Sequence, residues 1–140
     1  MQKLIITLIL FISGTLVSIA QEQTHHLTVE ITGMKNNNGR VYVALYNSEK
    51  TFLKDGFRGA IAKVSDKKAT VVFKNIPEGT YAISVYHDAD NNQKMDANFL
   101  GIPKERYGFS NNARGFMGPA KFKNAKFILS NDMTTHIKIH

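Results

Sequence analysis

The chain has 140 residues, a formal net charge of +7 and no cysteine. That length holds one domain, with or without a targeting segment, and is too short for a two-domain enzyme. The lack of cysteine excludes disulfides, thiol catalysis and thiolate metal ligands. A content of 43% hydrophobic and 21% charged residues is typical of a globular domain rather than a disordered chain.

Residues 1–20 are predicted to be a secretory signal peptide. Lys3 supplies a positive start, an apolar run follows, and Ser18 and Ala20 place small residues at a cleavage site. The alternative is an uncleaved membrane anchor, but the apolar stretch is short and polar for a span of about 20 residues. We therefore expect cleavage before Gln21, no transmembrane segment afterwards, and an exported protein in the periplasm or outside the cell.

Export also limits the kinds of partner that the basic charge could attract. Removal of Lys3 lowers the net charge from +7 to +6, and no run of cationic residues is longer than Lys67-Lys68. We expect a solvated basic surface, or loose attraction to anionic lipid headgroups or glycans. A nucleic-acid partner is not expected outside the cytoplasm.

The mature chain, residues 21–140, alternates apolar and polar side chains with a period of two, which predicts strands. The segment from Arg40 to Asn47 is apolar on both faces, which predicts a central strand. Seven strands are expected, at 27–32, 40–47, 60–65, 69–75, 80–87, 125–130 and 134–140. With Gly, Asn and Pro turns between them, they predict one all-β domain, a seven-stranded antiparallel β-sandwich.

The stretch from Phe73 to Tyr81 resembles the strand–turn–strand signature of transthyretin-like sandwich modules, which include carboxypeptidase regulatory-like and collagen-adhesin B-type repeats. The resemblance implies that Pro77 and Gly79 build a tight turn and that Tyr81 packs back on the core. We expect a positive φ at Gly79, so that Gly79→Val would cost about 1–2 kcal/mol.

Residues 88–123 form one long segment without a clear period. A loop of that length in a compact domain is either functional or disordered, and this one is too apolar for disorder. Its large apolar residues are Phe99, Leu100, Ile102, Tyr107, Phe109, Phe116, Met117 and Phe122. The segment is expected to be ordered, either as a cap on one end of the sandwich or as a binding surface.

The start of this segment has the spacing of a Ca²⁺-binding loop. Positions 1, 3, 5, 7 and 9 of such a loop are occupied by Asp88, Asp90, Asn92, Lys94 and Asp96. Side chains at positions 1, 3 and 5 can converge on one ion, and position 7 offers its carbonyl. Gln93 replaces the usual turn glycine, and Phe99 stands where a bidentate Glu is expected. The alternative is an Asx-rich turn that hydrogen-bonds its own backbone.

Three stretches, His87 to Asp96, Asn98 to Glu105 and Tyr107 to Asn112, resemble a small bacterial family catalogued only as domain of unknown function 2141. With the signal peptide and the Gly118-Pro119 segment, the resemblance covers nearly the whole mature chain. It implies an exported β-sandwich of Gram-negative bacteria with no established activity. Gln93 stands where the family is expected to carry Gly.

Other chemistries find little support. Ser110 does not lie in a G-x-S-x-G elbow, and the adjacent His87 and Asp88 point to opposite faces of a strand. His136 and His140 stand about 13 Å apart along a strand, too far to share an ion. The remaining pair, His25 and His26, lies near the mature N-terminus. We expect no catalytic residue and a structural role for His87.

The sequence thus favours a non-enzymatic, exported binding or interaction module whose acidic loop orders the long segment, with Ca²⁺ as its candidate cofactor. Its partner would be an envelope protein, a glycan or a small molecule. One alternative is a periplasmic hydrolase that uses the His87 region. The other is a structural envelope protein, favoured if the long segment exposes neither a pocket nor an apolar patch.

Overall fold

A computed structural model describes residues 21–140, and the predicted signal peptide, residues 1–20, lies outside the described residues. The described strands are β1 (Thr24–Thr32), β2 (Arg40–Tyr46), β3 (Arg58–Lys63), β4 (Lys68–Pro77), β5 (Gly79–Asp88), β6 (Tyr107–Phe109), β7 (Phe127–Leu129) and β8 (Met133–Lys138). Two short helical elements are the 3-10 turn η1 (Ser110–Asn112) and the helix α2 (Phe122–Ala125). None of the helices in this part of the chain has the length and apolar character needed to cross a membrane.

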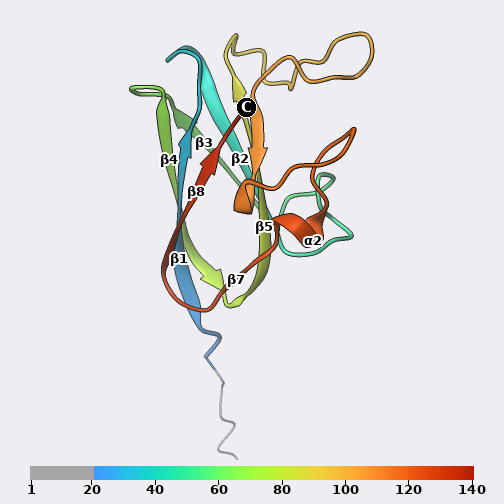
Figure 1. Ribbon diagram of the computed structural model, residues 1–140. Coiled ribbons are helices and arrows are strands. Elements are labelled where there is room, and N and C mark those ends of the chain that lie inside the picture. Colours follow the sequence, from blue (N-terminus) through green and yellow to red (C-terminus); the bar gives the residue numbers. More distant parts are fainter. Residues whose placement is uncertain (1–20) are drawn as a thin grey trace, which may run out of the picture.

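The strands form two sheets that face each other (Figure 1). One has three strands in the order β4-β1-β8. The other has the order β3-β2-β5-β6, and β7 pairs with the start of β5. The predicted two-sheet, all-β fold is therefore confirmed, and β2 has the expected central position.

Two details of the predicted sandwich were wrong. Residues 21–140 contain eight strands rather than seven, because Tyr107–Phe109 pairs with Ser84–Tyr86 of β5 inside the long segment. The sheets are also not wholly antiparallel, because β8 runs parallel to β1. A three-residue strand is too short to show a period, and an alternating pattern is the same for either strand direction.

The main core lies between the two sheets. Its fully buried side chains come from alternate positions of paired strands, because successive residues of a strand point to opposite faces. They include Leu27, Val29 and Ile31 of β1, Val41 and Leu45 of β2, Ile83 of β5, Leu129 of β7 and Ile137 of β8. Burial of this apolar surface is the dominant favourable contribution to folding.

A second apolar cluster covers the outer face of the larger sheet. Tyr46 of β2 and Ala82 of β5 point away from the main core and meet Phe52, Phe109 and Ala125. Phe52 lies 5.6 Å from Phe122 between ring centroids. Both faces of β2 and β5 are thus covered where Tyr46 pairs with Ala82, which explains the apolar side chains on both faces there. The long segment is ordered because it supplies this cover.

The turn between β4 and β5 differs from the prediction. Positive φ occurs at Asn75, at 55°, and not at Gly79, which opens β5 and pairs with Leu129. A Cβ on Gly79 would approach only the Tyr81 ring, at 3.4 Å. The strain expected for Gly79→Val therefore loses its basis. Tyr81 does pack on the core as expected, and its hydroxyl donates to the Pro77 carbonyl at 2.8 Å.

Candidate functional site

The acidic loop begins on a fully buried carboxylate. Asp88 ends β5, and its two oxygens accept backbone N–H groups from Asn92 at 3.1 Å and Gln93 at 2.9 Å. Asp90 accepts the same Asn92 N–H at 3.1 Å. The loop therefore winds around its own carboxylates, and Gln93 takes a φ of 63° to do so.

Glu105, at the far end of the loop, completes a group of three carboxylates with Asp88 and Asp90. One carboxylate oxygen from each of Asp88, Asp90 and Glu105 lies within 4.8 Å of the others. In residues 21–140 this is the only set of three or more acidic or histidine side chains close enough to share an ion. The spacing of acidic residues in the sequence did not reveal Glu105. It lies far along the loop from Asp90, and only the fold of the loop brings it close.

The other residues predicted to bind metal lie around this group. Asn92 joins Asp90 to Asp96, since its side-chain amide donates to both carboxylates, at 3.3 and 3.0 Å. Lys94 is exposed, and its backbone N–H donates to the Asn92 side-chain oxygen at 2.8 Å. Asp96 does not belong to the three-carboxylate group. Its backbone N–H instead donates to Glu105 at 3.3 Å.

Glu105 is held in an unfavourable electrostatic position. Burial raises its pKa above the usual value, and the charges of Asp88 and Asp96 raise it further. The backbone N–H groups of Asp96 and Ala89 oppose the shift by donating to the carboxylate. Three carboxylates drawn together repel one another, and a cation between them would relieve that repulsion.

The two residues considered for catalysis have structural partners. Ser110 is fully buried, accepts the Ile83 N–H at 2.9 Å and donates to the Ala125 carbonyl at 2.6 Å. His87 is buried, and its Nε2 lies 2.7 Å from the Asn38 carbonyl oxygen, to which it donates. Among the described residues no hydrogen bond joins His87 to Ser110.

A groove opens on the outer face of the larger sheet, between the two halves of the long segment. Three connections project from this side of the molecule, at 47–57, 89–106 and 113–121 (Figure 1). The groove has a volume of about 420 Å³ and takes residues from all three. Its walls include Leu53, Met95, Pro103 and Pro119, and its floor includes Ser84, Tyr86 and Tyr107.

Exposed apolar side chains stand beside this groove. Phe99 is 94% exposed and lies two residues before the lining residue Gly101. Phe116 is 94% exposed and Met117 93% exposed, just before the lining residue Gly118. The long segment therefore exposes both a pocket and apolar surface, although other parts of it pack on the sheet.

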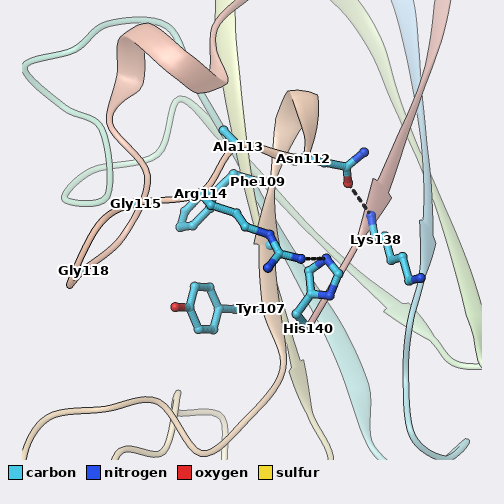
Figure 2. Close-up of a pocket in the computed structure, with 10 residues that line it drawn as sticks. Tyr107, Phe109, Asn112, Ala113, Arg114, Gly115, Gly118, Lys138 and His140 are labelled. Atoms are coloured by element: carbon cyan, nitrogen blue, oxygen red, sulfur yellow. Dashed lines mark hydrogen bonds between the residues drawn. The ribbon is translucent and has the colours of Figure 1, made fainter.

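A smaller hollow of about 230 Å³ adjoins the groove and is cationic (Figure 2). Arg114, Lys138 and His140 line it, together with Asn112, and the rings of Tyr107 and Phe109 form part of its wall. The Arg114 guanidinium donates to His140 Nε2 at 2.8 Å, and Asn112 accepts the Lys138 N–H at 2.8 Å. Sequence reasoning missed this hollow.

Fold and site together define a small all-β domain of two sheets, with an acidic loop and an apolar groove on one side. Within that class, residues 29–138 match the family model described as uncharacterized protein conserved in bacteria (DUF2141), and the chain belongs to this family. The resemblance to that family seen in the sequence is thereby confirmed. Comparison with the curated proteins and with the solved structures finds no significant match.

Proposed function

We propose that the protein is an exported, non-enzymatic binding module that holds an apolar small molecule in the groove between the long segment and the larger sheet. The observation that carries this proposal is the groove itself. Its volume of about 420 Å³ lies in the range of ligand pockets, and its lining is mainly apolar with a few polar groups such as Ser84 and the tyrosine hydroxyls.

The two alternative functions, a structural envelope protein and a hydrolase, have less support. A purely structural envelope protein gains nothing from leaving Phe99, Phe116 and Met117 almost fully exposed beside a groove. A hydrolase would need a nucleophile in reach of a base. Ser110 and His87 instead satisfy the hydrogen bonds of buried or half-buried backbone groups.

The groove is tested with 1-octanol, an uncharged apolar probe, in an NMR titration of the purified protein. Shifts confined to groove residues such as Ser84, Tyr86 and Tyr107 are expected. Leu53→Asp should weaken binding about tenfold or more, because a carboxylate in an apolar wall would lose hydration when the probe enters. Val72→Asp, at a half-exposed position on the opposite sheet, is the matched control. Wild-type protein that does not bind octanol contradicts the proposal.

Ca²⁺ is proposed as the ion that orders the acidic loop, held by Asp88, Asp90 and Glu105. Carboxylate oxygens suit this hard cation, and three carboxylates give the group its charge. The affinity is expected to be weak, on the order of 10⁻⁴–10⁻³ M, as in extracellular modules. At 100 times the dissociation constant, binding would stabilise the fold by about 2.7 kcal/mol.

Melting curves in EDTA, then with Ca²⁺ or Mg²⁺, test this cation site. Ca²⁺ should raise the melting temperature and Mg²⁺ much less, because Mg²⁺ demands a tighter octahedron and gives up its waters reluctantly. Asp90→Asn and Glu105→Gln should remove most of the response, while the control Asp96→Asn should keep it. A wild-type curve that ignores millimolar Ca²⁺ means that the loop is only a turn that satisfies its own backbone.

The transthyretin-like assignment of the sandwich is also a proposal. It is supported by the strand–turn–strand from Phe73 to Tyr81, in which Tyr81 packs back as that signature implies. An experimental structure, superposed on transthyretin-like domains, would test it through the strand order.

A further inference from the structure

The hollow beside the groove is lined by basic side chains and by no acidic side chain. None of its ten lining residues is acidic, although Arg114, Lys138 and His140 are among them. The ion pairs found in residues 21–140 involve neither Arg114 nor Lys138, nor the nearby Arg106. Figure 2 shows the Arg114 side chain reaching the His140 ring, while the Lys138 side chain points away from both. An anion beside the Arg114 guanidinium would be attracted to its positive charge.

The contact between Arg114 and His140 shows how these groups are arranged. A guanidinium has no acceptor, so His140 Nε2 must accept this hydrogen bond and the ring must be neutral. Partial burial lowers the pKa of His140, and Arg114, Lys138 and Arg106 lower it further. The hollow therefore holds donors for an oxyanion and gains a further charge when His140 is protonated.

The cationic hollow and the apolar groove are continuous. Tyr107, Phe109 and Gly118 line both of them. Tyr107 and Phe109 project from the same side of β6, with ring centroids 5.8 Å apart. A molecule lying over these two rings would have apolar walls at one end and the Arg114 guanidinium at the other (Figure 2).

We propose that the molecule bound is an amphipathic anion, with its apolar chain in the groove and one oxyanion headgroup against Arg114 and His140. This inference rests on the proposed function and names its ligand class. Arg114 supplies a planar pair of donors that matches a carboxylate, sulfonate or phosphate.

Three probes separate the two halves of the site: 1-octanesulfonate, which stays charged near neutral pH, 1-octanol, which has the same chain without charge, and methanesulfonate, which has the headgroup alone. Their dissociation constants are measured calorimetrically with the purified protein. Octanesulfonate should bind about tenfold more tightly than octanol, because hydrogen bonds to charged groups are the stronger ones. Methanesulfonate should bind more weakly than either.

Arg114→Gln should reduce the advantage of octanesulfonate over octanol to about twofold or less, and leave octanol binding unchanged. Lys123→Gln removes an exposed cation of α2 that does not line the hollow. This variant should change neither the affinity for octanol nor the affinity for octanesulfonate. Arg114 is exposed, so the variant is expected to fold, and its melting curve verifies this. As an independent readout, octanesulfonate should raise the pKa of the His140 ring in an NMR pH titration, whereas octanol should not.

The outcomes are distinguishable. If octanol and octanesulfonate bind equally well in the groove, the proposed function stands and the anion inference is overturned. If Arg114→Gln keeps the full advantage of octanesulfonate, the headgroup does not bind in the hollow and the inference is also overturned. If neither probe binds, the groove proposal fails and the inference fails with it.

Discussion

Gln93 donates its backbone N–H to the buried carboxylate of Asp88 at 2.9 Å, and it does so with a φ of 63°. This is the left-handed region, which favours glycine and costs a residue with a Cβ about 1–2 kcal/mol. The loop keeps this conformation because both oxygens of a fully buried carboxylate need donors, and Asn92 and Gln93 supply them.

Gln93→Gly is therefore expected to stabilise the protein, by about 0.5–1 kcal/mol, since the gain at positive φ is partly offset by the entropy of glycine. Urea unfolding of both proteins measures the change. The control is Lys94→Gly, one residue on, where φ is not positive and the substitution should destabilise. A lower midpoint for Gln93→Gly would show that the side chain contributes more than the strain costs.

Ser110→Ala is expected to cost about 2–3 kcal/mol. The substitution removes the buried Ser110 hydroxyl, which accepts the Ile83 N–H and donates to the Ala125 carbonyl. Both backbone groups would then lack a hydrogen-bond partner. Ser84→Ala is the control, because its hydroxyl bonds only the Tyr46 hydroxyl, at 3.1 Å, where water has access. The free energies of unfolding should differ clearly between the two variants. Equal, small losses would contradict the structural role of Ser110.

Gly108→Val is expected to destabilise the protein by about 1–3 kcal/mol through overpacking. A Cβ at this position of β6 would lie 3.2 Å from the γ-methyl groups of Ile137 and Ile139 and from the Lys138 carbonyl oxygen. Gly59→Val on β3 is the control, since its Cβ would approach nothing closer than 3.9 Å, and valine suits a strand. Thermal melts of both variants decide the matter. A Gly108→Val protein as stable as wild type would show that β6 can move away from β8.

Glu105 should give the unfolding free energy an unusual pH dependence. Because burial raises its pKa in the folded state, the folded protein binds this proton more readily than the unfolded one. In EDTA, the contribution of Glu105 to stability should therefore rise as the pH falls from 7 toward 4.5, the ordinary pKa of a glutamate side chain. Urea titrations of wild type, with Glu105→Gln as the baseline, isolate this contribution.

Saturating Ca²⁺ should reverse the sign of that dependence. A bound cation favours the charged carboxylate, so the folded-state pKa of Glu105 would fall below the unfolded value. Its contribution to stability would then be present at neutral pH and lost on acidification through the lowered pKa. If the unfolding free energy changes with pH in the same way in EDTA and in Ca²⁺, Glu105 is not a Ca²⁺ ligand.

Much of the fold could be predicted from the sequence, because alternation is a local property. The apolar residues of β1, at Leu27, Val29 and Ile31, indicate a strand with one buried face, and they are fully buried. The two apolar faces of β2 indicate a central strand, and β2 lies between β3 and β5. The order of the long segment followed from its apolar content, since that much apolar surface has to pack against something.

The sites depended on tertiary structure, because their residues come from segments far apart in the chain. Local spacing found Asp88 and Asp90, but only the return of the loop brings Glu105 beside them and leaves Asp96 outside the group. The hydrogen bonds between Tyr107 and His140, at 3.0 and 3.3 Å, join the end of one sheet to the edge of the other. Through them Arg114, Lys138 and His140 reach one hollow beside the groove, a juxtaposition that no sequence period contains.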